Sequence, residues 1–234
     1  HYKEVTSVYD SNFFYGPEMK EFQVNIVKEI VSKGLAGKGS ISDLSFADLG
    51  GGTGVFSSLV HKTLGLKKDI LCIDPSKSML AKAKDLEGVQ TLCCGALEFA
   101  EGVEDASFDV VLMKEMIHHL DLKEAGQVFS KLKRGMKSGG QCVLMTRPLD
   151  PDYPFFDKAM KVWKDNATSS KTIMDLLTKA GFEKANATVH STPVVLNKEK
   201  WMEMVRSRFW STFSRAHFND EELGAGIEEI GKRY

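Results

Sequence analysis

The stretch FADLGGGTGVFSSLV, residues 46–60, decides the fold of this chain. It begins as a short apolar run, reaches an acid at Asp48, passes through four glycines in five positions, and continues with the apolar spacing of a helix. Glycine tolerates positive φ and lets a ligand approach the backbone closely, and the start of a helix presents unpaired N–H groups. The stretch therefore predicts a strand, a ligand-binding turn and a helix in succession.

The composition is that of an ordinary globular protein. The chain has 234 residues, of which 42% are hydrophobic and 27% charged, with a net charge of −1. This length favours a single α/β domain, and the charge gives no attraction to nucleic acid or to an acidic membrane. No apolar run approaches the roughly 20 residues of a membrane span, and no signal-peptide pattern opens the sequence. We therefore expect a cytoplasmic protein that binds neither nucleic acid nor membranes.

The four cysteines each lie in or beside a predicted strand and form no CxxC motif. Cys93 and Cys94 are adjacent, so in a strand their side chains point to opposite faces. This pattern favours reduced thiols and no metal. A metal or arsenic site is the alternative.

Apolar runs alternate with amphipathic runs along the rest of the chain. We expect strands at 44–48, 69–74, 89–94, 107–114, 141–146, 183–190 and 193–196. We expect helices at 17–33, 54–64, 76–86, 121–136, 153–165, 170–180, 198–214 and 220–231. Continuous apolar strands are typical of parallel sheets, which are buried on both faces. The alternation predicts an α/β, doubly wound, Rossmann-like sheet, whose ligands bind beyond the carboxyl ends of the strands.

The residues that follow the first two predicted strands indicate the kind of ligand. The glycines of residues 50–54 have G-x-G-x-G spacing, whereas a dinucleotide site requires its third glycine at position 55, which is Val55. An acid before the glycines, Asp48, is wrong for a pyrophosphate and suits a ligand with a cationic part. Asp74 ends the second strand, where an acid can accept hydrogen bonds from a ribose diol.

Four segments together resemble the motif series of class I S-adenosylmethionine-dependent methyltransferases. They are FADLGGGTG (46–54), DILCIDPSKSMLAKAK (69–84), FDVVLMKEMIHHL (108–120) and MKSGGQCVLMTRP (136–148). The likeness spans roughly residues 40–190 and is closest in style to the small-molecule branch that includes the ubiquinone-biosynthesis and trans-aconitate methyltransferases. It implies a seven-stranded sheet with strand 7 antiparallel between strands 5 and 6. It also implies S-adenosyl-L-methionine as cofactor and S-adenosyl-L-homocysteine as product.

The resemblance also implies positions for the cofactor. The cofactor-binding set that it predicts is Asp48, Gly50, Gly51, Gly52, Thr53, Gly54, Asp74, Pro75, Met79, Gly95, Ala96, Leu97 and Lys114. The glycines are expected along the methionine part, Asp74 at the ribose hydroxyls, and Pro75 with Met79 on the adenosine side. Asp48 either supplies negative charge near the ammonium and sulfonium or orders the glycine loop through its amides.

The chain departs from the family in two places. Gly95 stands where many relatives have an acid that receives the adenine amino group, so we expect adenine to contact the main chain of Gly95 and Ala96 and the side chain of Leu97. Lys114 and Glu115 follow strand 4, where small or apolar residues are usual. We expect Lys114 to face the cofactor and Glu115 the substrate. The alternative is that they pair with each other or face solvent.

A catalytic base is optional, because transfer from a sulfonium requires mainly alignment of the acceptor. His118 and His119 follow strand 4, where a histidine can deprotonate an acceptor near neutral pH. Adjacent side chains point apart, so at most one is expected to serve, and a structural role is the alternative. Arg147, after strand 5, is a candidate for binding an anionic substrate.

Aromatic segments at both ends of the predicted core suggest an acceptor cavity in a single methyltransferase domain, residues 1–234. We expect an N-terminal lid and helix at 1–34, the catalytic core at 40–196 and a C-terminal helical extension at 197–234, the additions forming a lid. The candidate substrate contacts are Tyr9, Phe14, Tyr15, Glu115, His119, Arg147, Arg206, Phe209 and Trp210. Aromatic stripes at helical spacing are also typical of packed cores.

An aromatic cavity with arginines favours a small organic acid or a phenolic metabolite as acceptor. The alternatives from other classes are a protein methyltransferase, a non-catalytic cofactor-binding regulatory module, and a nicotinamide oxidoreductase. The sequence is compatible with a monomer or a homodimer.

Overall fold

The apolar run that ends at Asp48 is the central strand of a parallel sheet. A computed structural model describes residues 16–35, 39–192 and 197–234. They fall into two compact units, each described by itself. The core unit comprises residues 16–35, 39–146 and 171–185, and the second unit comprises residues 147–170, 186–192 and 197–234.

The core unit contains one five-stranded sheet in the order β3-β2-β1-β4-β5, with every neighbouring pair parallel. Its strands are β1 (Phe46–Leu49), β2 (Ile70–Ile73), β3 (Val89–Leu92), β4 (Phe108–Lys114) and β5 (Met136–Met145). The α-helices of this unit are α2 (Pro17–Gly34), α3 (Val55–Leu64), α4 (Lys77–Ala83), α5 (Ala96–Gly102), α6 (Leu122–Gly135) and α8 (Ser170–Lys179). Short 3-10 turns are η3 (Ile41–Asp43) and η4 (Ile117–His119).

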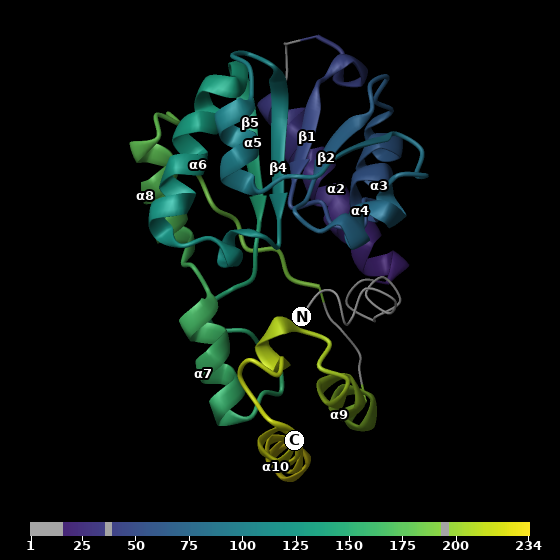
Figure 1. The fold of residues 1–234 in the computed structure, drawn as a ribbon, viewed down its shortest axis with the longest axis vertical. Helices are drawn as coiled ribbons and strands as arrows, with labels where there is room; N and C mark the ends of the chain where they lie inside the picture. Colours follow the sequence, from purple (N-terminus) through teal and green to yellow (C-terminus); the bar gives the residue numbers. More distant parts are fainter. Residues whose placement is uncertain (1–15, 36–38, 193–196) are drawn as a thin grey trace. The chain divides into compact units, whose positions relative to one another are not determined.

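Helices cover both faces of this sheet (Figure 1). Helices α2, α3 and α4 lie on one face and α5, α6 and α8 on the other. All four residues of β1 are buried. Its side chains alternate between the two layers, as in any strand. Phe46 joins the α2–α3 cluster, and Ala47 and Leu49 join the cluster under α5, α6 and α8. The predicted doubly wound parallel sheet is confirmed for these five strands.

Several helix boundaries agree with the sequence for identifiable reasons. Pro17 lies in the first turn of α2, as predicted, and Ser76 caps α4 because its side chain accepts a hydrogen bond from the N–H of Met79. The buried side of α2 is Val24, Val27 and Val31. Helix α5 was not predicted.

The expected sixth strand is not observed in the described residues. Residues 183–192 contain no strand, and nearly all of them are exposed, with Val189 at 85% exposure. This segment, EKANATVHST, carries too few apolar side chains to bury a face against a sheet. Residues 193–196, predicted as strand 7, lie outside the described residues. Strand β5 is longer than expected, because KSGG (137–140) belongs to it.

The second unit is built on aromatic packing. It contains α7 (Asp157–Asn166), α9 (Lys198–Arg206), the 3-10 turn η5 (Ser211–Phe213) and α10 (Asp220–Arg233). Rings lie in contact across these elements, with centroid separations of 4.3–6.5 Å, and they belong to Tyr153, Phe155, Phe156, Trp163, Trp201, Phe209, Trp210, Phe213 and Phe218. The indole N–H groups of Trp163 and Trp201 donate to the carbonyls of Pro148 and Pro154, at 2.9 and 2.7 Å. The unit therefore has a closed aromatic core with satisfied polar edges.

The helix predicted at 198–214 ends early, at Arg206. Arg208 adopts a left-handed φ of +56°. Its guanidinium donates to the carbonyls of Phe213 and Phe218, at 2.7 and 2.9 Å, and to Asp220 at 2.8 Å. These three hydrogen bonds stabilise the loop that follows α9. They would be lost if the helix continued.

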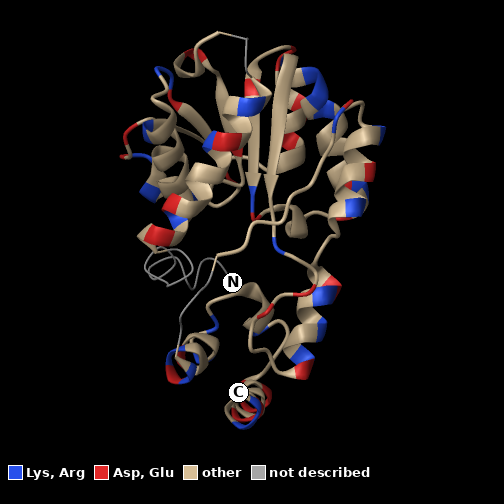
Figure 2. Ribbon diagram, turned by 180° about the vertical axis from the view of Figure 1, so that it is seen from behind, with Lys and Arg blue, Asp and Glu red and all other residues tan. Residues whose placement is uncertain are grey.

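Charges of both signs are interspersed over the helices of both units (Figure 2). Within the described ranges, no helix has the length and apolar character needed to cross a membrane.

Two glycines of α10 provide a test of the aromatic core. A Cβ on Gly226 would lie 2.6 Å from ring atoms of Phe156, whereas a Cβ on Gly224 meets nothing within 4 Å. We expect Gly226→Ala to destabilise the second unit by roughly 1–3 kcal/mol through overpacking. Gly224→Ala should stabilise it by about 0.5–1 kcal/mol, because alanine favours a helix.

The measurement is denaturant unfolding followed by tryptophan fluorescence. All three tryptophans, Trp163, Trp201 and Trp210, lie in the second unit, so the signal reports on that unit alone. Equal effects of the two substitutions would contradict the packing described for α10.

Candidate functional site

The sheet has its topological switch point between β1 and β4. From β1 the chain proceeds outward to β2 and β3 in one direction, and through β4 to β5 in the other. Asp48 lies opposite Cys72 of β2 and Leu112 of β4, so the carboxyl ends of these three strands meet at one edge. Ligands of open α/β sheets bind at such an edge. The sequence-predicted residues that follow β1, β2 and β4 are thus brought together.

Three of the four loop glycines are required by the fold itself. An added Cβ on each would collide with a neighbouring side chain. The three approaches are 2.7 Å from Gly50 to Met116 Cβ, 2.5 Å from Gly51 to Cys72 Sγ, and 2.6 Å from Gly54 to Ala83 Cβ. Thr53 is buried within the same loop. These contacts explain most of the glycine run without any ligand.

Gly52 is different from the other three. Its φ is +58°, and a Cβ placed on it would meet nothing within 4 Å. Its N–H donates to Asp74 Oδ2 at 3.1 Å. The outer side of Gly52 is therefore open to a ligand that approaches the backbone.

Asp74 is held in place from two sides. Its Oδ1 accepts a hydrogen bond from the N–H of Ser76 at 2.8 Å, and its Oδ2 accepts the one from Gly52. Burial raises the pKa of this carboxyl, and the two backbone donors oppose the shift. Each carboxylate oxygen has a further lone pair. Asp74 is therefore oriented to accept hydrogen bonds from a diol beyond the strand end.

Asp48 is a buried carboxylate that is only half satisfied. It is 1% exposed, and its Oδ2 accepts a hydrogen bond of 2.6 Å from the hydroxyl of Ser57 on α3. Its Oδ1 has no hydrogen-bond partner among the residues that the structure describes. Burial raises the pKa of Asp48 to about 6, the charge of Lys114 lowers it, and the charge of Asp74 raises it further.

A raised acid pKa has a defined effect on stability. The folded form binds the Asp48 proton more tightly than the unfolded chain does, so this group stabilises the fold below its unfolded pKa of 3.8. That contribution is lost as the pH rises through about 6. At neutral pH the buried charge costs about 3 kcal/mol. Perturbed groups of this kind concentrate at functional sites.

Lys114 and Glu115 leave β4 at the same edge. The Lys114 ammonium lies 4.9 Å from the centre of the Phe56 ring, on the first turn of α3. Glu115 has a φ of +53°, and its N–H donates to the carbonyl of Met145 at 2.8 Å. A left-handed conformation is uncommon for a residue other than glycine and is typical of functional positions.

His118 and His119 lie in the 3-10 turn η4, with His118 half-buried and His119 exposed. Their ring centroids are 4.1 Å apart. The expectation that the two side chains point apart is therefore wrong. Successive residues of a 3-10 turn diverge by about 120°, whereas those of a strand lie on opposite faces.

The residues expected on the adenine side also lie beyond the strand ends. Gly95 precedes α5, and a Cβ placed on it would meet nothing within 4 Å. Its N–H donates to Glu98 Oε2 at 3.4 Å, a contact that sequence reasoning missed. Ala96 and Met79 are buried, Pro75 is exposed, and Leu97 packs partly against the core cluster.

The remaining substrate candidates are not in the described part of the core unit. Tyr9, Phe14 and Tyr15 lie outside the described residues. The others belong to the second unit. Arg147 stacks over Trp163 at 4.6 Å, Arg206 is exposed at the end of α9, and the buried rings of Phe209 and Trp210 are 4.3 Å apart.

Sequence reasoning also missed Ser57 and Phe56. Ser57 donates a hydrogen bond to the Asp48 carboxylate, and the Phe56 ring lies beneath the Lys114 ammonium. Ser57 is fully buried. Its signal is a small polar side chain in the apolar face of the helix that follows the glycine loop. Phe56 carries no sequence signal of its own, because an aromatic residue on an apolar helix face is typical of a core.

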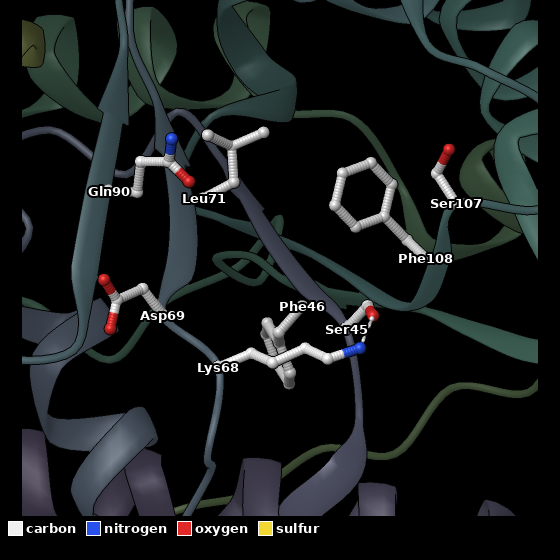
Figure 3. Close-up of a pocket in the computed structure, with 8 residues that line it drawn as sticks. All are labelled: Ser45, Phe46, Lys68, Asp69, Leu71, Gln90, Ser107 and Phe108. Carbon is white, nitrogen blue, oxygen red and sulfur yellow. Dashed lines mark hydrogen bonds between the residues drawn. The ribbon is translucent and has the colours of Figure 1, made fainter.

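A separate pocket lies at the opposite, amino edge of the sheet (Figure 3). It is lined by Ser45, Phe46, Lys68, Asp69, Leu71, Gln90, Ser107 and Phe108. Lys68 reaches across it to donate to the Ser45 hydroxyl at 3.2 Å. None of the predicted site residues lines this pocket, so it is distinct from the site at the carboxyl edge.

Solved structures with this fold are numerous. A protein described as a methyltransferase from an antibiotic biosynthesis pathway of Anabaena variabilis is 22% identical, with a TM-score of 0.69 over 89% of this chain and 85% of that one. One described as a sarcosine dimethylglycine methyltransferase from Galdieria sulphuraria is 17% identical, with a TM-score of 0.55 over 88% and 79%. Geranyl diphosphate C-methyltransferase from Streptomyces coelicolor, in complex with Mg²⁺, geranyl diphosphate and S-adenosyl-L-homocysteine, is 16% identical, with a TM-score of 0.54 over 92% and 75%.

No curated protein matches the sequence. A family model described as "Methyltransferase domain" matches residues 47–144, which run from β1 to β5 and contain the whole switch-point edge. The likeness in style to the ubiquinone-biosynthesis and trans-aconitate enzymes stays a prediction. Residues 47–144 of the core unit therefore match a methyltransferase domain, and the chain shares its fold with structures of methyltransferases, one of them in complex with S-adenosyl-L-homocysteine.

Proposed function

We propose that this protein transfers a methyl group from S-adenosylmethionine to a small-molecule acceptor, with the cofactor at the carboxyl edge of β1, β2 and β4. The observation that carries the proposal is Asp48, a buried carboxylate with an unpaired oxygen beside a glycine loop. A buried unpaired charge is destabilising unless a ligand supplies the missing partner. The ammonium and sulfonium of S-adenosylmethionine are such partners.

The other residues of this edge fit the same cofactor. Asp74 would accept the ribose hydroxyls, since both its oxygens are oriented by backbone donors. The open side of Gly52 would admit the methionine part, and Pro75 with Met79 would line the adenosine. The N–H of Gly95 would have to break its hydrogen bond to Glu98 before it could donate one to adenine. When bound, the cofactor supplies an activated methyl group.

The acceptor would be aligned by groups that follow β4. Glu115, His118 and His119 are the candidates in the core unit, one of the histidines serving as base if the acceptor must lose a proton. Arg147, Arg206, Phe209 and Trp210 are the candidates in the second unit. Two solved structures with this fold are described as methyltransferases of small molecules, one as a sarcosine dimethylglycine methyltransferase and the other as geranyl diphosphate C-methyltransferase.

An organic acid or a phenol is the acceptor class that these arginines and rings favour. A protein acceptor and a non-catalytic regulatory module are the alternatives. We further propose a cytoplasmic monomer or homodimer in which both units belong to one functional domain.

The proposal is tested by calorimetric titration with S-adenosylmethionine, S-adenosylhomocysteine and NADH, followed by turnover assays with acids, phenols, amines and thiols. Micromolar binding of the first two ligands, without NADH, is expected. Binding without turnover of any small molecule would favour the regulatory module. Absence of binding would overturn the cofactor site.

Gly52 offers a test with a closely matched control. Gly52 and Gly65 have φ values of +58° and +61°, and a Cβ on either meets nothing within 4 Å. Their replacement by alanine therefore imposes the same backbone strain, about 1 kcal/mol. We expect Gly52→Ala to weaken S-adenosylhomocysteine binding at least tenfold more than Gly65→Ala, because only Gly52 borders the ligand. Equal affinities in calorimetry would show that no ligand approaches this loop.

Asp74 is tested against an acid at the other end of the same strand. Asp74→Ala should weaken S-adenosylhomocysteine binding by about 1.5–3 kcal/mol, the value of hydrogen bonds to a charged group. Asp69→Ala should leave the affinity unchanged, because Asp69 is exposed and lies just before β2. If the two variants bind alike, Asp74 does not hold the ribose.

Asp48 predicts how the affinity depends on pH. A cationic ligand favours the charged carboxylate, so binding lowers the Asp48 pKa below its free value of about 6. Affinity for S-adenosylhomocysteine should then fall by up to about tenfold between pH 7 and pH 5, because the proton competes with the ligand. Asp48→Asn should bind more weakly at pH 7 but without this slope. A wild-type profile that stays flat over this range would remove Asp48 from the ligand site.

A further inference from the structure

The pocket at the amino edge of the sheet opens on the face that carries α5. Leu71 and Phe108 line it and pack against the cluster under α5, α6 and α8. Gln90 pairs in register with Leu71, so its side chain shares this face. Helix α5 has only seven residues and does not bury them, since Gln90 is exposed and the other two are half-buried. The hollow measures about 410 Å³, which suits a small molecule.

Two lysines converge on one serine hydroxyl beside this hollow. Lys68 and Lys137 both donate to Ser45 Oγ, at 3.2 and 3.3 Å, and Figure 3 shows Lys68 reaching it across the pocket. A hydroxyl oxygen has two lone pairs and one hydrogen to donate. Because ammonium groups occupy both lone pairs, the hydroxyl can only donate further. Within the described part of the chain no group accepts this hydrogen, so Ser45 presents an unused donor.

The two ammonium groups differ in how their charge is balanced. Lys137 forms an ion pair of 2.7 Å with Asp109, whose carboxylate also accepts the N–H of Ser45 at 2.7 Å. Lys68 has no carboxylate within 4 Å among the residues that the structure describes. An ammonium has three N–H groups, and the bond to Ser45 uses one of them. Lys68 is therefore the uncompensated positive charge that lines the hollow.

We propose that this hollow binds a small aromatic carboxylate, whose oxygens accept hydrogen bonds from Lys68 and Ser45. Two donors that lack an acceptor match an anion, and charge-assisted hydrogen bonds are the strong ones in proteins. Leu71 and Phe108 offer apolar surface to a flat ring. Asp69 also lines the hollow and repels a second negative charge on the ligand. The site therefore favours a singly charged carboxylate over a doubly charged phosphate, and it does not depend on methyl transfer.

The probe is 4-fluorobenzoate, whose binding is followed through the fluorine NMR signal of the ligand. Two relatives of the probe separate the contributions to binding. 4-Fluorobenzamide keeps the ring and loses the charge, and 4-fluorophenyl phosphate carries a second negative charge. We expect saturable binding of 4-fluorobenzoate by the wild-type chain, and about tenfold weaker binding of the other two. Equal affinity for 4-fluorobenzamide would overturn the inference, because it would show that the hollow does not recognise the charge.

Lys68→Met removes the charge from an exposed side chain, so the fold is retained. We expect this variant to bind 4-fluorobenzoate about tenfold more weakly and 4-fluorobenzamide as well as wild type. Lys67→Met is the matched control. The neighbouring Lys67 is also exposed, but it pairs with Asp43 at 2.7 Å and does not line the hollow, so its replacement should change nothing. Equal losses in the two variants would show that the anion responds only to the net charge of the chain, and would overturn the site.

The two serines of the hollow provide a second matched pair. The hydroxyl of Ser107 donates to the carbonyl of Glu104 at 2.8 Å, so it has no hydrogen left for an anion. We expect Ser45→Ala to weaken 4-fluorobenzoate binding about tenfold and Ser107→Ala to leave it unchanged. The lysine variants decide the inference if Ser45→Ala does not fold.

Two further results would contradict the inference. If Lys68→Met and Ser45→Ala both bind 4-fluorobenzoate as wild type does, the anion binds elsewhere on the chain, for example at the proposed acceptor site. If the wild-type chain shows no saturable binding, the hollow holds no carboxylate. Neither result affects the proposed cofactor site, which is tested by S-adenosylhomocysteine.

Discussion

The site depends on one buried charge, the carboxylate of Asp48 at the end of the central strand. Burial between β2, β4 and α3 makes this charge costly, and the Ser57 hydroxyl compensates only one of its oxygens. The loop that follows is shaped around it. A side chain on Gly51 would meet both the Cys72 sulfur and an oxygen of Asp48, so acid and glycine are required together. A ligand with positive charge is the natural complement of this arrangement.

Asp74 gives the edge its rigidity. It ends β2, yet it accepts a hydrogen bond from Gly52 in the loop after β1 and from Ser76 at the start of α4. One carboxylate thus links two strand ends and a helix. The amides of Gly50 and Gly51 reinforce this link by donating to the carbonyl of Ile73, at 2.8 and 3.1 Å. This edge is therefore ordered by the protein's own hydrogen bonds, and a preorganised site loses less entropy when a ligand binds.

The aromatic residues of the second unit form its packed core. Phe209 and Trp210 are buried in a network of rings, and the indole groups of Trp163 and Trp201 are satisfied by backbone carbonyls. Arg208 is committed to two carbonyls and to Asp220. Arg147 instead stacks its guanidinium on Trp163. Such stacking keeps a cation in a fixed orientation, which suits the role proposed for it with an anionic acceptor.

The sequence by itself determined five parallel strands of the seven that it predicted, and the residues that end β1, β2 and β4, because these five strands are continuous apolar runs and the ends of β1, β2 and β4 carry chemically distinctive residues. It failed where the local pattern was weak, as at residues 183–192, whose apolar content is too low for a strand. Only the tertiary structure decided that Gly52 is open while its neighbouring glycines are packed, that Ser57 and Phe56 contact the charged groups of Asp48 and Lys114, and that the rings of His118 and His119 lie close together. These features depend on residues far apart in sequence, whose approach is fixed by sheet register and helix packing and by no local pattern.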